Sequence, residues 1–216
     1  MAATKATKPC RVCEAPATAP FALCFCCATL VRQLQMPLVP LVAVTDYRMG
    51  DVMHRRLRGY KDGPVAEVRA ACTVRLASML EAWLATAGSC SPAAGVVASD
   101  TVVTVPSSSR PAGAPFEAVI SVSPTLARRH RPRLVRGPEP TGHLAASRRG
   151  FSVPPGTDRE GLAGRSVVVL DDSVVTGARA QSAAAALRLA GADVVGVVAL
   201  GRLVAARAPF RPTPAL

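Results

Sequence analysis

The chain has 216 residues, half of them apolar, which is enough for one domain of ordinary size with a small appendage. Lys and Arg outnumber Asp and Glu by 26 to 14, and the charge of +12 favours anionic partners over basic ones. No apolar segment near the N-terminus resembles a secretory signal, and Gly, Pro or Arg interrupts every apolar run before it reaches the length of a membrane span. We therefore expect a cytoplasmic protein with no membrane partner.

Five of the seven cysteines lie close to the N-terminus. Four of them form two Cys-x2-Cys pairs separated by ten residues, namely Cys10, Cys13, Cys24 and Cys27. Four thiolates at this spacing are typical of a tetrahedral zinc site, and a site with four protein ligands is structural because no position is open. Cys26 is an alternative to Cys27 as the fourth ligand, and a set of small buried thiols without a metal is the plainer alternative. This cysteine usage also favours a reducing compartment.

We expect residues 1–36 to form this zinc-binding module, because Pro37 and Pro40 mark a boundary. The next part of the chain alternates short apolar runs with Pro- and Gly-rich stretches. Periodicity predicts strands over residues 41–44 and 101–105, helices over 50–60, 64–87 and 116–120, and loops over 88–99 and 137–158. Cys72 falls on the apolar stripe of the helix over 64–87, so we assign it to the core.

The last third of the chain has the clearest pattern. It predicts a strand over 166–170, an Ala-rich helix over 178–190 that ends at Gly191, and a strand over 194–200. A strand, a helix and a strand with short connections form a βαβ unit, which implies an α/β fold with a parallel sheet flanked by helices. We expect this domain to span residues 37–206 and a Pro-rich disordered tail to follow over 207–216.

Two carboxylates, Asp171 and Asp172, follow the first strand of this unit, where open α/β sheets bind ligands. The predicted turn from Ser173 to Gly177 leads into the helix, whose first N–H groups are free to bind an anion such as phosphate. Ionised carboxylates only accept hydrogen bonds, so their natural partner is a vicinal diol. A phosphate and a diol a few ångströms apart describe a ribose 5-phosphate group, which explains both halves of the motif.

Three further segments have alternative interpretations. A loop after the strand over 101–105 is a candidate for a second anion such as pyrophosphate, or else an ordinary polar turn; its residues are Ser107, Ser108, Ser109 and Arg110. Lys61 either approaches the ligand or lies in a solvated turn. The five arginines between Arg128 and Arg136 are a candidate site for single-stranded DNA, or else a solvated basic loop.

The stretch VVVLDDSVVTGAR resembles the phosphoribosyl pyrophosphate (PRPP) signature of the type I phosphoribosyltransferases. The resemblance implies that the catalytic acids Asp171 and Asp172 contact the ribose, and that Mg²⁺ accompanies the pyrophosphate. It also implies that the 5-phosphate is held by Ser173, Val174, Val175, Thr176, Gly177, Ala178 and Arg179. The family usually has a hydroxyl residue where this chain has Val175 and Arg179, so binding of PRPP is favoured over turnover.

A four-Cys module ahead of this motif resembles the ComF family, as do LRGYKDG, VPSSSRP, RRGF and the segment after the signature. The likeness runs from Cys10 to about Arg202 and implies a phosphoribosyltransferase-like protein linked to competence and DNA uptake. The RRGF element continues with Ser152 and Val153 where the family commonly has Asn-Gln. The alternative function is a non-catalytic module of the same fold that binds DNA or a DNA-processing protein. The sequence does not identify an acceptor substrate or an oligomeric state.

Overall fold

The computed structural model describes residues 7–86, 92–107, 115–131, 134–154 and 161–205. The expected disordered tail over 207–216 lies outside these residues. Within them, no helix has both the length and the apolar character needed to cross a membrane.

Four parallel strands form the central sheet in the order β3, β8, β7, β4. Their bounds are Leu41–Tyr47 for β3, Thr101–Thr104 for β4, Ser166–Val174 for β7 and Asp193–Leu203 for β8. The two longest strands, β7 and β8, lie at the centre and are linked by helix α6 (Ala178–Leu189), so the predicted βαβ unit is present. The α/β class with a parallel sheet flanked by helices is confirmed.

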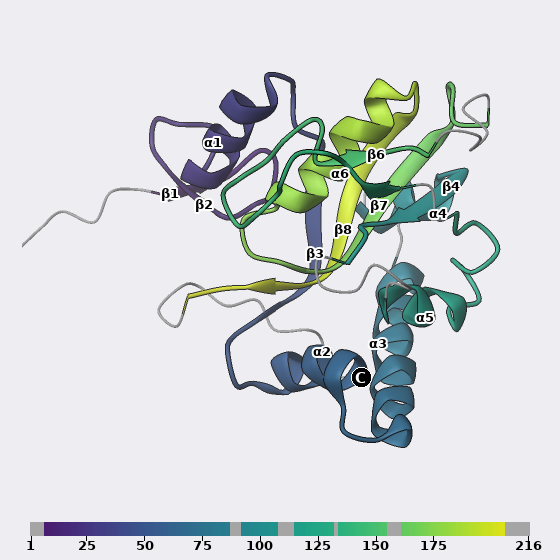
Figure 1. The fold of residues 1–216 in the computed structure, drawn as a ribbon. Coiled ribbons are helices and arrows are strands. Elements are labelled where there is room, and N and C mark those ends of the chain that lie inside the picture. The colour runs from purple at the N-terminus through teal and green to yellow at the C-terminus, as the bar shows by residue number, and fades with distance from the viewer. Residues whose placement is uncertain (1–6, 87–91, 108–114, 132–133, 155–160, 206–216) are drawn as a thin grey trace, which may run out of the picture.

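Side chains alternate along β7 between two apolar cores, as the two-residue period of a strand requires. Val167 and Val169 pack with the Ala-rich α6, whereas Val168 and Leu170 pack with helices on the opposite face. That face is covered by α2 (Val52–Asp62), α3 (Ala66–Ala85), α4 (Pro92–Ala98) and α5 (Pro115–Ser121). The sheet is therefore a buried layer between helices (Figure 1).

The sequence misplaces the end of β7 and misses α4. We placed the end of β7 at Leu170; the strand continues to Val174 because Asp171, Ser173 and Val174 still pair with β8. The acids therefore lie within the last part of the strand. The loop expected over residues 88–99 contains α4, which forms from Pro92 to Ala98. The short apolar run of α4 shows no periodicity, and its C-terminal carbonyls are bound by the distant Arg129.

The N-terminal cysteines belong to a small unit of three elements: β1 (Thr7–Pro9), β2 (Pro16–Thr18) and α1 (Phe25–Leu34). β1 and β2 pair antiparallel. The unit lies beside α6 in Figure 1, and the Leu41 N–H at the start of β3 donates to the Val12 carbonyl at 2.7 Å. The division of the chain at residue 36 stays a prediction.

A second small sheet forms from β5 (Val135–Arg136) and β6 (Phe151–Ser152), which pair antiparallel. Between them lie residues 137–150, the first part of the loop that the sequence predicts over 137–158. The prediction is wrong at β6, which forms a short strand inside that range. Phe151 is buried in the core on the α6 side of the central sheet. The β5–β6 pair therefore brings both ends of the loop close to α6.

Candidate functional site

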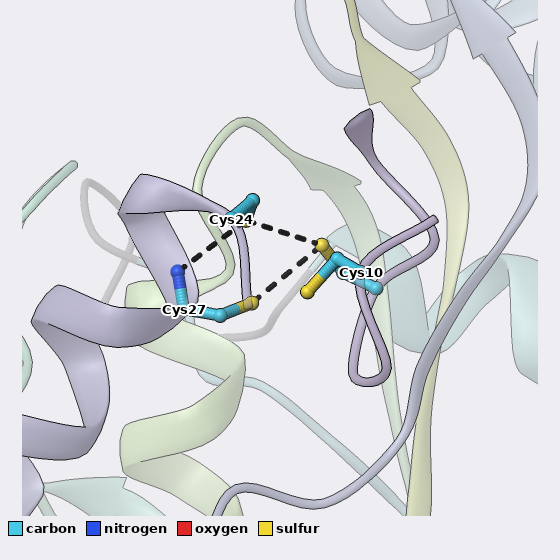
Figure 2. A group of neighbouring side chains, drawn as sticks. Cys10, Cys24 and Cys27 are labelled. Carbon is cyan, nitrogen blue, oxygen red and sulfur yellow. Dashed lines mark hydrogen bonds between the residues drawn. The ribbon is translucent and has the colours of Figure 1, made fainter. Parts of the chain in front are cut away.

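The four predicted zinc ligands come together in one cluster. The Sγ atoms of Cys10, Cys13, Cys24 and Cys27 all lie within 4.8 Å of one another. Cys13 Sγ is 3.7 Å from Cys24 Sγ and 3.5 Å from Cys27 Sγ. Figure 2 shows the sulfur atoms of Cys10, Cys24 and Cys27 directed toward a common centre.

Local structure explains this convergence. Cys24 is the N-cap of α1, and its Sγ accepts a hydrogen bond from the Cys27 N–H at 3.5 Å. At the other end of the cluster, the Cys10 carbonyl accepts from the Glu14 N–H in a tight turn where Glu14 has a φ of 59°. This turn and the first turn of α1 bring the two Cys-x2-Cys pairs face to face.

The cluster fits a tetrahedral metal ion such as zinc. With bonds of about 2.3 Å, a tetrahedral zinc holds its sulfur ligands about 3.8 Å apart, close to the separations observed. Cys27 is part of the cluster, whereas Cys26 lies outside it and packs against the small core of the module. The alternative ligand Cys26 is therefore not supported by the geometry.

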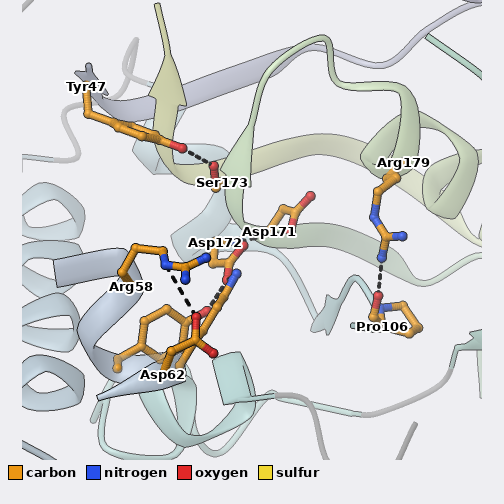
Figure 3. Close-up of polar contacts among 10 residues, drawn as sticks. Tyr47, Arg58, Asp62, Pro106, Asp171, Asp172, Ser173 and Arg179 are labelled. Carbon is orange, nitrogen blue, oxygen red and sulfur yellow. Dashed lines mark hydrogen bonds and ion pairs between the residues drawn. The ribbon is translucent and has the colours of Figure 1, made fainter. Parts of the chain in front are cut away.

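The second acid of the pair, Asp172, meets side chains from helix α2. Asp172 is buried, and its Oδ2 accepts a hydrogen bond from the Tyr60 hydroxyl and forms an ion pair with Lys61 Nζ. Figure 3 shows Asp171 and Asp172 beside the end of α2 that carries Arg58 and Asp62. The Asp172 carboxylate is thus neutralised by the chain itself.

The sequence of α2 accounts for this placement. Asp51 caps the helix by accepting from the His54 N–H at 2.8 Å. Met53, Leu57 and Tyr60 then recur every three or four residues and face the sheet. Gly59 lets α3 approach closely, since a Cβ at this position would lie 2.6 Å from Cys72 Sγ. Tyr60 and Lys61 therefore reach the acids from a well-packed helix.

Asp171 has a different environment from Asp172. Burial and, secondarily, the charge of Asp172 raise the pKa of Asp171 to about 8. One of its oxygens, Oδ1, accepts from the Asp172 N–H at 3.0 Å. The pair therefore holds one carboxylate that is matched by a lysine and one whose ionisation is disfavoured by burial and by the charge of its neighbour.

The turn after β7 has the backbone expected of an anion site. Gly177 has a φ of 82°, a left-handed conformation that glycine adopts without strain, and α6 begins at the next residue. The Thr176 hydroxyl donates a hydrogen bond to the His143 carbonyl, and its oxygen lies 3.4 Å from the Ala178 nitrogen that donates to it. Residues of the 137–150 loop therefore contact the turn directly.

Arg179 points back toward the end of β4 instead of into solvent. Its guanidinium donates to the Pro106 carbonyl, as Figure 3 shows, and lies over the Phe151 ring with its centre 5.6 Å from the ring centroid. Burial lowers the pKa of Arg179. Arg136 Nε donates to the neighbouring Ser107 carbonyl at 3.3 Å. Two cations therefore border the loop that we proposed for a second anion.

One cavity of about 360 Å³ brings these groups together. All of Asp171 to Arg179 line it, and so does Ser107; Ser108, Ser109 and Arg110 lie outside the described residues. Lys61 also lines the cavity, which favours the first of its two interpretations. The volume is suited to a small phosphorylated sugar. The roles of the individual residues stay predictions.

Sequence reasoning missed two of the cavity's residues. Tyr60 lies at helical spacing from Met53 and Leu57, a pattern that indicates packing alone, yet its hydroxyl reaches Asp172. His143 lies in a loop without periodicity, and nothing in its neighbourhood indicated that its carbonyl meets Thr176. Ser173 was predicted as a phosphate ligand, but its hydroxyl is 2.5 Å from the Tyr47 hydroxyl and is already partnered.

The basic run does not behave as one exposed patch. Arg129 Nη1 donates to the carbonyls of Val96, Val97 and Ser99 at 2.8 to 3.0 Å, so it caps the C-terminus of α4. Arg128 and Arg131 are exposed, and Arg133 lies outside the described residues. Any anion-binding role of the run therefore rests on Arg128 and Arg131 among the described arginines before β5.

Comparisons with known proteins add little. No protein-family model matches the chain, and no curated protein is similar enough to count as a relative. A solved structure described as the allosteric regulatory enzyme of purine biosynthesis is similar over 67% of this chain, with 21% identity and a TM-score of 0.41. The chain spans 30% of the length of that structure. A likeness of this size gives no information about function, so the function must be inferred from the chemistry of the site.

Proposed function

We propose that the cavity binds the ribose 5-phosphate group of PRPP or of a nucleotide-like ligand. The observation that supports this most is that the acid pair and the glycine turn at the start of α6 line one cavity. A diol donates to the carboxylates of Asp171 and Asp172, and a phosphate accepts from the turn between Val175 and Ala178. Tyr60 and Lys61, which also line the cavity, neutralise Asp172 until the diol takes their place.

The finer form of this proposal is phosphoribosyl transfer in a ComF-like protein. In that reaction the bond from the anomeric carbon to pyrophosphate breaks, and pyrophosphate leaves with the electron pair. An acceptor nucleophile then bonds to the same carbon and loses its proton. Positive charge develops at the anomeric carbon, so the carboxylate charge of the acid pair, carried chiefly by Asp172, stabilises the transition state. Mg²⁺ would supply charge neutralisation for the pyrophosphate, and these two carboxylates are ligands of the type it prefers.

Two departures favour binding over turnover. Val175 is 45% exposed at the turn and has no hydroxyl to offer a phosphate. Arg179 donates to Pro106 and so is partly occupied. The four-Cys cluster has a separate role in this proposal, which is to hold a structural zinc ion that fixes α1 against the domain.

The diol assignment is tested with two sugars. Ribose 5-phosphate and 2-deoxyribose 5-phosphate are titrated separately into the protein, and the ribose compound is expected to bind at least about fivefold tighter because one hydrogen bond to a charged group is lost with the hydroxyl. The double variant Asp171→Asn, Asp172→Asn should lose this preference. Equal affinities for the two sugars in the unaltered protein would contradict the assignment.

A second candidate is a DNA-binding module in competence or DNA uptake. It is supported by the charge of +12 and by the exposed Arg128 and Arg131. Single-stranded DNA binding should then weaken steeply with salt, and the variant Arg128→Gln, Arg131→Gln should reduce the slope of log affinity against log salt by about 1.4. A slope that is unchanged in this variant excludes these arginines as the contact.

A further inference from the structure

A side chain of the N-terminal four-Cys module contacts a loop that borders the ligand cavity. Gln33, in the last turn of α1, donates from Nε2 to the Leu144 carbonyl at 2.7 Å. Its Oε1 accepts from the Ala146 N–H at 2.9 Å. A single amide side chain therefore satisfies a backbone donor and a backbone acceptor two residues apart.

The segment between Gly142 and Ser147, which we name the clamp loop, is held at further points. The Gly142 N–H donates to the Ala145 carbonyl at 2.9 Å, so the loop closes on itself. The Ser147 N–H donates at 3.0 Å to the Ser182 hydroxyl, which is fully buried on α6. The clamp loop is thus fixed between α1 on one side and α6 on the other.

The clamp loop ends against the proposed phosphate turn. Gly142 and His143 line the cavity, and the His143 carbonyl accepts the hydrogen bond of the Thr176 hydroxyl. A hydroxyl has only one proton to donate. While Thr176 donates to His143, it has none for a phosphate, and the carbonyl oxygen brings a partial negative charge to a place that suits an anion.

We propose that Gln33 is a positioning residue that holds the clamp loop closed and thereby weakens anion binding at the Thr176 turn. The N-terminal module then regulates the site it is docked beside, because loosening its hold on Leu144 and Ala146 releases the Thr176 hydroxyl. This inference rests on the proposed function, since it assumes that the turn binds a phosphate. It goes beyond that function by assigning the module a control over affinity.

The chain offers a matched pair of variants. Gln33→Asn shortens the side chain by one methylene, so that it no longer spans both backbone groups. Gln35→Asn makes the same chemical change two residues later. Among the hydrogen bonds of the described residues, the Gln35 side chain bonds only the Arg32 carbonyl. Gln35 has a φ of 51°, a left-handed conformation that asparagine adopts readily. Both variants should keep the metal content of the unaltered protein and have closely similar melting temperatures, because neither touches the cysteine cluster.

Ribose 5-phosphate is titrated into the unaltered protein and both variants, and amide hydrogen exchange is followed at Ala146. The proposal expects Gln33→Asn to bind about three- to fivefold tighter than the other two proteins and to exchange faster at Ala146. Affinity that is equal in the two variants, or lower in Gln33→Asn, overturns the clamp while leaving the proposed function intact. Binding to none of the three proteins contradicts the proposed function as well, so the two failures are distinguishable.

Discussion

The four-Cys cluster and the acid pair on β7 both gather groups that become anionic, but they are neutralised in different ways. The cluster is built from Cys10 to Cys27, and its thiols face one another around a common centre. Asp172, in contrast, is matched by Lys61 and Tyr60 of α2, the latter 112 residues away in the chain. The cysteine cluster needs a bound metal ion to neutralise its thiolates, whereas Lys61 of the protein itself neutralises Asp172.

This difference indicates what each region does. A site that lacks its own positive charge is stable as a thiolate cluster only when a metal is bound, which is the behaviour of a structural site. A site whose acid is already paired must exchange Lys61 and Tyr60 contacts for ligand contacts. Such an exchange is compatible with reversible binding of a sugar hydroxyl.

The largest effect should come from breaking the cluster. We expect Cys24→Ser to weaken zinc binding more than about 100-fold, since even outer contacts to a metal ligand are worth 10- to 100-fold. The N–H groups of α1 should then exchange rapidly. Zinc content per chain and amide exchange are the measurements, and Cys26→Ser is the control because Cys26 lies outside the cluster. Equal zinc content in the two variants would contradict the ligand set.

The next effect concerns the neutralised acid. Asp172→Asn leaves Lys61 without its carboxylate and should lower the free energy of unfolding by about 1–3 kcal/mol, as measured by urea denaturation. The matched control is Asp62→Asn, which breaks the exposed pair with Arg58 at 3.4 Å and should cost less than about 0.5 kcal/mol. If both variants cost the same, the Lys61–Asp172 pair is no more than a surface contact.

A smaller effect is expected in how the stability of the protein depends on pH, and it concerns Asp171 and not Asp172. Because burial raises the pKa of Asp171 to about 8, ionisation of this group is easier in the unfolded chain than in the folded one. The contribution of Asp171 to the free energy of unfolding is therefore largest below the pKa of this group in the unfolded chain, and it is lost as pH rises toward 8. Relative to the unaltered protein, Asp171→Asn should therefore gain stability between pH 6 and 8, by at most about 1.4 kcal/mol per pH unit. Urea midpoints that run parallel for the two proteins would refute the raised pKa.

The smallest expected effect is a gain in affinity for ribose 5-phosphate. Val175→Thr restores a hydroxyl at the exposed turn with little change in shape and should tighten ribose 5-phosphate binding by about twofold to fivefold. Val195→Thr is the control, since Val195 is also exposed but lies on β8 outside the cavity. A change of the same size in both variants would show that the turn does not hold the phosphate.

The two regions also differ in how far the sequence predicts them. The metal ligands lie within 18 residues of chain, so their spacing alone indicated the cluster. The βαβ unit was predicted because β7, α6 and β8 have strong periodicity and short connections. The contacts that complete the acid site come from elements distant in the chain, such as Tyr60 on α2 and His143 in the clamp loop, and no local pattern specifies such pairings.

The errors have related causes. α4 was missed because its end is bound by Arg129, a residue that the sequence presented as part of a basic run. The end of β7 was placed too early because carboxylates are rare in buried strands, whereas here pairing with β8 and the Lys61 contact keep Asp171 and Asp172 inside the sheet. In both cases a long-range contact prevailed over local propensity.

Calorimetric titration of PRPP into the zinc-loaded protein, with and without Mg²⁺, is the most direct test of the acid pair and its turn. We expect saturable binding that Mg²⁺ strengthens and that the double variant Asp171→Asn, Asp172→Asn abolishes. Absence of binding at millimolar PRPP, or binding that survives in the double variant, would contradict the assignment of the acid pair and its turn as a ribose 5-phosphate site.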